Sequence, residues 1–150
     1  MKRLVLDTNL LVLFIVGNAD IRRVGARRTE AFTAEHFNKL NEIAGSHKAH
    51  VSTPNVLTEA SNLIGAADQE LAKGAARLLA EYISRLDEIY EPSSKLIRGP
   101  LYARHGLADA SLAVLAVNGD RVLTADGPLY GIMSGHGILV ENFTHLISYD

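Results

Sequence analysis

The first sixteen residues hold an apolar run that is interrupted by three polar residues, Asp7-Thr8-Asn9. Residues 4–6 form a short apolar segment without alternation, which predicts a buried strand of a parallel sheet. Residues 10–16 resume the apolar pattern and predict the start of a buried helix. Asp7 would then lie at the carboxyl end of the strand, where open α/β sheets bind their ligands. Burying a carboxylate between two apolar segments is costly unless another group pairs with it, so a partner is expected elsewhere in the chain.

Composition limits the kind of protein that the chain can be. With 150 residues and 47% hydrophobic content, it is long enough for a single domain over residues 1–150 with a real core. Its formal net charge of -2 excludes a strongly basic nucleic-acid binder, so any basic footprint must be local. The absence of cysteine excludes disulfides and thiolate metal sites and predicts a cytoplasmic location. The interrupted first segment is too short to span a membrane and lacks a signal-peptide cleavage pattern.

The rest of the chain alternates between predicted strands and helices. Further strands are predicted at residues 49–52, 88–90, 121–124 and 138–140. Helices are predicted from a Thr29 cap to about Ala44, from Thr53-Pro54 onward, from an Asp68 cap to about Leu86, and from Gly106 to Val117. The glycine-rich residues 131–137 are predicted to be a loop. This alternation implies a mainly parallel sheet that is covered by helices on both faces.

Four acidic residues stand out by their positions. Asp7 and Asp126 follow predicted strands, and Glu59 borders the apolar stripe of the helix after the second strand. Asp109 is the only charged residue of an otherwise apolar helix. All four are expected on one side of the sheet, where they would repel one another and have raised pKa values unless a cation neutralised them. Mg²⁺ and Mn²⁺ prefer such oxygen ligands, so the set predicts metal-assisted hydrolysis of a phosphodiester.

Each acid also has an ordinary structural explanation. Asp7 could cap the following helix, and Asp109 could be a first-turn acid favoured by the helix dipole. Asp126-Gly127 is a good turn by itself, and Glu59 could be a solvated helix residue. Four such coincidences in matching positions are less expected than one shared site.

The segments around these acids resemble, in order, the four acidic motifs of the PIN-domain ribonucleases. The matching segments are residues 4–9 (LVLDTN), 53–59 (TPNVLTE), 106–112 (GLADASL) and 122–126 (VLTAD). The resemblance implies an α/β fold of the three-layer α/β/α sandwich type with a mainly parallel central sheet. It also implies Mg²⁺- or Mn²⁺-dependent cleavage of single-stranded RNA and, often, a homodimer. Many small bacterial members of the family are VapC-type toxins that a partner antitoxin neutralises.

The resemblance also implies roles for the individual residues. Asp7 and Asp109 would be the principal metal ligands, and Glu59 would complete the site or position the attacking water. Asp126 would hold a second ion or a water of the first. Asn9 and Thr124 are expected either to hydrogen-bond a carboxylate or bound water, or to be turn residues. Candidate phosphate contacts are Arg22, Arg23, Arg27, Arg28, Arg98 and Arg104.

Other functions fit the sequence less well. A dehalogenase-like phosphatase would need a second acid where Asn9 stands, and the glycine-rich nucleotide motifs and HExxH are absent. The serious alternative is a non-catalytic PIN-like scaffold that binds RNA or a protein partner. Such scaffolds usually lose one or more of the acids, whereas all four are present here. Residues 10–16 and 71–83 are apolar enough to form either a dimer interface or the core.

Overall fold

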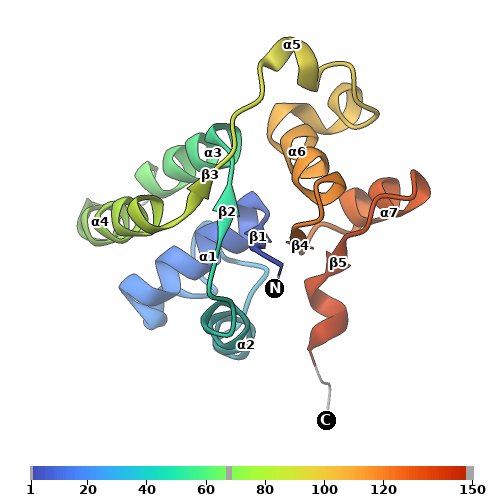
Figure 1. The fold of residues 1–150 in the computed structure, drawn as a ribbon. Helices are drawn as coiled ribbons and strands as arrows, with labels where there is room; N and C mark the ends of the chain where they lie inside the picture. The colour runs from blue at the N-terminus through green and yellow to red at the C-terminus, as the bar shows by residue number, and fades with distance from the viewer. Residues whose placement is uncertain (1, 67–68, 148–150) are drawn as a thin grey trace.

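The computed structural model describes residues 2–66 and 69–147, which form an α/β fold with a small parallel sheet (Figure 1). The elements are β1 (Leu4–Leu6), α1 (Thr8–Ala19), the 3-10 helix η1 (Ile21–Arg23), α2 (Ala34–Gly45), β2 (Val51–Ser52), α3 (Pro54–Gly65), α4 (Gln69–Arg85), β3 (Asp87–Glu88), α5 (Ser93–Leu96), α6 (Tyr102–Val117), β4 (Arg121–Thr124), α7 (Gly127–Gly135), β5 (Glu141–Asn142) and the 3-10 helix η2 (Phe143–Leu146). The predicted Asp68 cap lies outside the described residues. In the described parts of the chain, every helix is too short or too polar to cross a membrane.

All paired strands are parallel, as the sequence predicts. β1 pairs with β4, placing Leu6 opposite Leu123, and β4 pairs with β5. β2 pairs with β3, and a parallel bridge between Leu4 and His50 joins these two strands to β1. The resulting order is β3-β2-β1-β4-β5. From β1 the chain adds β2 and β3 on one side, and it then adds β4 and β5 on the other side, so the strand order reverses between β1 and β4. Ligands bind open α/β sheets at the carboxyl ends of the strands beside such a reversal.

The centre of the core is formed by β1 and α1. The predicted strand at residues 4–6 is confirmed, and each of its side chains is at most 2% exposed. The helix predicted at residues 10–16 is confirmed but runs from Thr8 to Ala19, and it packs against α2, α3 and α4. Because residues 10–16 are buried within one copy of the chain except at half-buried Phe14, they belong to its core and leave no apolar face for a dimer.

Gly17 lies inside α1, at a position where a neighbouring aromatic ring occupies the space that a side chain would take. A Cβ atom at Gly17 would lie only 2.2 Å from the Phe37 ring of α2. Phe37 is itself buried, so the ring lies directly on the α1 backbone. This glycine therefore serves close packing of two helices, and α1 continues past it to Ala19.

The helix predicted to begin at Thr29 begins at Ala34, with Thr33 as its N-cap. The Thr33 hydroxyl accepts from the backbone N–H of His36 at 3.3 Å, and the His36 ring accepts from the backbone N–H of Thr33 at 2.8 Å. This reciprocal pair is a capping box. The hydroxyl of Thr29 is instead buried in the preceding loop, where it accepts from the backbone N–H of Gly25.

The prediction of a loop at residues 131–137 is wrong, because most of this segment lies in α7. Asp126 caps the helix, and Pro128 occupies its first turn, where a missing N–H costs nothing. Leu129 and Met133, four residues apart, form its buried stripe. Packing of that stripe and the cap offset the low helix propensity of the glycines.

The boundaries of the last strand also differ from the prediction. The strand predicted at residues 138–140 is replaced by β5 at residues 141–142. The N–H of Ile138 bonds the carbonyl of Met133 and so ends α7 rather than joining the sheet. Sheet pairing therefore starts three residues later. The strand predicted at residues 88–90 is β3 at 87–88, and the strand at 121–124 is confirmed.

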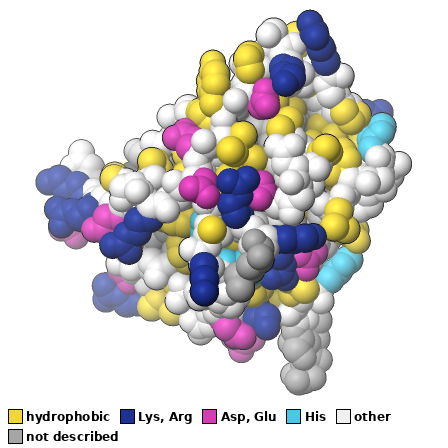
Figure 2. All heavy atoms as spheres, viewed as in Figure 1, with side chains coloured by type: hydrophobic (Ala, Val, Ile, Leu, Met, Phe, Trp, Pro, Cys, Tyr) yellow, Lys and Arg dark blue, Asp and Glu magenta, His cyan; other side chains and the backbone are white. Residues whose placement is uncertain are grey.

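Charges at the amino end of the sheet are paired. Arg3 contacts both oxygens of Asp120 at 2.9 and 3.1 Å, and Arg121 contacts both oxygens of Glu141. On the face shown in Figure 2, lysines and arginines are interspersed with acidic residues and form no single basic surface. This pairing contrasts with the carboxyl end of the same strands.

Candidate active site at the carboxyl edge of the sheet

Asp7 leaves β1 at its carboxyl end and caps α1. One carboxylate oxygen accepts from the backbone N–H of Leu10 at 2.8 Å. The other accepts from the hydroxyl of Thr124 at 2.5 Å and from the N–H of Ala125 at 3.0 Å. Asp7 is 3% exposed, and burial raises its pKa, although the three hydrogen bonds oppose that rise. The capping explanation is thus confirmed, and the carboxylate is held at the reversal between β1 and β4.

The end of β4 connects Asp7 with Asp126. Thr124 is fully buried, donates its hydroxyl proton to Asp7 and accepts from the N–H of Asp126 at 3.0 Å. The predicted contact of Thr124 with a carboxylate is therefore confirmed. Asp126 is half-buried and caps α7 through the N–H of Leu129 at 2.9 Å. The negative charge of Asp126 contributes to the raised pKa of Asp7, so these two acids act on each other.

Asp109 lies just after an interruption in α6. Gly106 has φ 82° and ψ −175°, so the helical segment that carries Asp109 starts immediately after it. The ring Nδ1 of His105 lies 3.4 Å from a carboxylate oxygen of Asp109. Burial raises the pKa of Asp109 to about 6, the charges of Asp7, Asp126 and Glu59 raise it as well, and His105 lowers it. The other three predicted acids thus all lie within electrostatic reach of Asp109.

Glu59 is exposed on α3, the helix that follows β2. This helix is joined to α6 by a buried contact between the hydroxyls of Thr53 and Ser111 at 2.7 Å. Ser111 donates to the carbonyl of Ala108, so the Thr53 hydroxyl is the donor in that contact. A cleft of about 450 Å³ opens beside Glu59 between the two helices. Its lining residues are Pro54, Asn55, Thr58, Glu59, Asn62, Leu107 and Ala108.

The side chains at this edge fit a hard divalent cation. Among the described residues, no three histidine or acidic side chains form a ready-made ligand cage. Mg²⁺ does not require one, because it keeps several waters and binds through one or two carboxylates and substrate phosphate. The buried hydroxyls of Thr8 and Ser52, at the ends of β1 and β2, have no hydrogen-bond partner within the described chain. Oxygen donors at three neighbouring strand ends are the ligand chemistry that Mg²⁺ and Mn²⁺ prefer.

Sequence reasoning did not identify His105 as part of this site. Its spacing of four residues from Asp109 is the usual signal for neighbours on one helix face. Gly106 concealed that signal, because the predicted helix began at the glycine. Asn9 lies in α1 with an exposed side chain and hydrogen-bonds none of the four acids within the described residues, so its contact with a bound water stays a prediction. Of the candidate phosphate-binding arginines, Arg22 is paired with Asp20 at 2.9 Å.

No protein-family model matches the chain, and no curated protein matches it. The chemistry proposed below for the candidate site therefore rests on the geometry and charge of its four carboxylates.

The raised pKa of Asp109 predicts a pH-dependent stability of the metal-free protein. Between the ordinary aspartate pKa of 3.8 and about 6, the folded state binds more protons at this group than the unfolded state does, so stability falls as pH rises. Asp109→Asn is therefore expected to become more stable than wild type as pH rises from 4 to 7. After allowance for solvent screening, we expect a difference of about 1–2 kcal/mol.

Urea unfolding at several pH values in EDTA measures this difference. Glu35→Gln, which removes a carboxylate from an exposed position of α2, is measured in the same way as the control. A profile of Asp109→Asn parallel to that of wild type would contradict the raised pKa of Asp109.

Proposed function

We propose that the chain is a PIN-like, metal-dependent endoribonuclease that hydrolyses phosphodiester bonds of single-stranded RNA. The observation that carries this proposal is the shared edge of four carboxylates. Within the described residues, none of the four has a lysine or arginine partner, and the one basic side chain paired with any of them is that of His105, beside Asp109. Uncompensated negative charge of this kind is what a divalent cation neutralises.

The four acids would have different roles according to how deeply each is buried. Asp7 and Asp109 would hold the ion, and Asp126 would hold a second ion or a water of the first. Glu59, which is exposed at the cleft, would orient the attacking water and accept its proton. When bound, Mg²⁺ or Mn²⁺ lowers the pKa of a water and neutralises charge at phosphorus. Thr124 and the N–H of Ala125 hold the Asp7 carboxylate in one orientation.

The cleft beside Glu59 supports a single-stranded substrate. Besides Glu59, its polar lining comes from Asn55, Thr58 and Asn62, which are uncharged and carry both donors and acceptors. Such groups suit the edges of unpaired bases and the 2′-hydroxyl better than phosphates. A base seated in the cleft would place its phosphate next to Glu59.

The resemblance extends the proposal to the fold and to partners. A parallel strand order of β3-β2-β1-β4-β5 supports a three-layer α/β/α sandwich. Figure 1 places α3 and α4 beside β2 and β3, and α6 and α7 beside β4 and β5. A homodimer and a protein antitoxin belong to the proposal on the resemblance alone. Of the two segments predicted as dimer surfaces, residues 71–83 include an exposed apolar side chain, that of Ile83 on α4.

The test is cleavage of a mixed pool of single-stranded RNA by wild type and by Glu59→Gln, each with Mn²⁺ or with EDTA. Because Glu59 is exposed, this substitution preserves packing, and it should slow cleavage about 10²–10⁴-fold. Glu35→Gln, also exposed, should cleave like wild type.

Each other result has a definite meaning. Cleavage that persists in EDTA, or that Glu59→Gln leaves unchanged, would refute the proposed site. RNA binding without Mn²⁺-dependent cleavage would favour the non-catalytic scaffold.

A further inference from the structure

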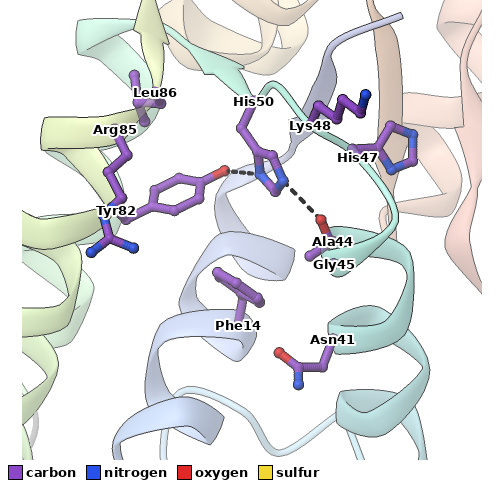
Figure 3. A pocket seen from close by; sticks show the side chains of 10 residues that line it. All are labelled: Phe14, Asn41, Ala44, Gly45, His47, Lys48, His50, Tyr82, Arg85 and Leu86. Carbon is purple, nitrogen blue, oxygen red and sulfur yellow. Dashed lines mark hydrogen bonds between the residues drawn. The ribbon is translucent and has the colours of Figure 1, made fainter. Parts of the chain in front are cut away.

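A second cavity, of about 430 Å³, lies at the opposite, amino end of the sheet (Figure 3). Its walls are the ends of α2 and α4, the segment that leads into β2, and the ring of Phe14 on α1. His50 and Leu86, which line it, immediately precede the first residues of β2 and β3. None of the four carboxylates of the candidate active site lines this cavity.

One wall of the cavity is fixed by a hydrogen-bond chain. The Nε2 atom of His50 lies 2.9 Å from the carbonyl of Ala44 and must donate to it, because a carbonyl only accepts. Burial lowers the pKa of His50, which keeps the ring neutral, so Nδ1 accepts from the Tyr82 hydroxyl at 2.8 Å. The Tyr82 ring also packs edge-on against Phe14, with ring centroids 5.6 Å apart. Two aromatic rings are thus held in place around the cavity.

The side-chain groups that remain free around this wall are hydrogen-bond donors. Lys48 and Arg85 line the cavity and have no ion-pair partner in the described chain. The carbonyl oxygen of the Asn41 side chain accepts from Asn18 at 3.3 Å, which leaves its NH₂ group free to donate. No acidic residue lines the cavity, and Glu81 of α4 lines an adjacent hollow together with Arg85. The cavity therefore favours a ligand that carries negative charge and acceptors.

The arrangement of these groups also indicates the shape of the ligand. Figure 3 shows Phe14 between Arg85 on one side and Asn41 on the other. A flat ring can pack on Phe14 while an anionic group on the same molecule reaches Arg85, whose guanidinium can bind phosphate through two parallel hydrogen bonds. The volume lies within the range of small-molecule sites.

We propose that this cavity binds a nucleoside monophosphate, with its base against Phe14, its phosphate at Arg85, and a base acceptor at the Asn41 amide. The proposal concerns a site remote from the carboxylates and does not depend on the nuclease function. It assigns a ligand class to a surface that the proposed RNA chemistry leaves unused.

Isothermal titration of the protein with AMP, GMP, CMP and UMP in EDTA tests the proposal, since without a divalent cation the carboxylates repel phosphate. At least one nucleotide should saturate the protein below about 1 mM. Arg85→Gln should weaken that binding about tenfold or more, because it removes a charged hydrogen-bond donor. Arg77→Gln, also exposed on α4 but outside the cavity, is the matched control and should bind like wild type.

Two further ligands measure the contributions of the base and of the phosphate separately. The nucleoside and inorganic phosphate should each bind more weakly than the nucleotide, because each makes only part of the contacts. In NMR spectra, the side-chain amide of Asn41 should shift on binding while signals around Asp109 stay in place. Lack of saturation by all four nucleotides, equal affinity of Arg85→Gln and Arg77→Gln, or shifts confined to the Asp109 edge would overturn the proposal.

Discussion

Asp7→Asn is expected to abolish metal-dependent RNA cleavage and still to give a folded protein. The amide is neutral and is a poor ligand for Mg²⁺ or Mn²⁺, so the edge loses its most rigidly held carboxylate. We expect a loss of about 10²–10⁴-fold or more in the cleavage rate, measured on the RNA pool with Mn²⁺. Asp20→Asn replaces another helix-capping acid, remote from the edge, and should leave cleavage unchanged.

The same substitution should change the pH dependence of stability. An Asn side chain has one acceptor oxygen, so it cannot satisfy both the Leu10 N–H and the Thr124–Ala125 pair, which costs about 1 kcal/mol. It also removes a buried charge whose raised pKa destabilises the folded state increasingly as pH rises above 3.8, the ordinary pKa of an aspartate. Asp7→Asn should therefore be less stable than wild type at pH 4 and gain relative stability toward pH 8.

Urea unfolding at pH 4 and pH 8 in EDTA measures both effects. A variant that fails to fold at pH 8 would show that Asp7 serves chiefly as a helix cap. Loss of cleavage by a well-folded variant would separate the chemical role from the structural one.

Gly17→Ala is expected to destabilise the protein by about 2 kcal/mol, although alanine favours helices. The added Cβ would lie 2.2, 2.4 and 2.7 Å from three ring carbons of Phe37, so α1 and α2 would have to separate or the ring would have to leave its position. Overpacking of this kind typically costs about 1–3 kcal/mol, as much as or more than the gain in helix propensity.

Gly74→Ala in α4 is the matched control, because a Cβ there meets nothing within 4 Å. It should stabilise the protein by about 0.5–1 kcal/mol. Urea unfolding measures both variants at one pH. The double variant Gly17→Ala, Phe37→Leu should recover part of the loss, since the smaller side chain frees the space. A Gly17→Ala protein as stable as wild type would contradict the close packing of α1 on α2.

Sequence patterns predicted the elements whose signals are local and continuous. The strand at residues 4–6, the helix after it and the strand at residues 121–124 are apolar runs bounded by polar residues. The Thr53-Pro54 start of α3 has a cap and a first-turn proline, and the structure confirms it. These features depend on few residues, so neighbouring elements did not change them.

The errors arose where two similar local signals competed. Thr29 and Thr33 are equally good caps by composition, and only burial of the Thr29 hydroxyl in the preceding loop decides between them. The capping box at Thr33 uses His36 instead of the glutamate or glutamine by which such boxes are usually recognised. In α7, glycines suggested a loop, whereas burial of Leu129 and Met133 supports a helix.

For the candidate site, the sequence could predict proximity but not the details of each contact. Parallel topology alone requires the ends of β1 and β4 to adjoin, so the meeting of Asp7 with Thr124 follows from the strand order. The sequence could not show that Asp7 is both a helix cap and a member of the carboxylate group, because either role alone accounts for an aspartate between a strand and a helix. Whether the four acids hold a metal stays a prediction.

The pairing of β1 with β4 has a consequence for how the protein is made. The contact of Thr124 with Asp7 joins residues that are 117 positions apart in the chain. During translation, Asp7 is therefore synthesised long before β4, the strand whose Thr124 orients its carboxylate. Contacts so distant in sequence form late in folding. Under the proposed function, the carboxylate edge is complete only after β4 has been synthesised, so the RNA-cutting site is absent while the earlier part of the chain is being made.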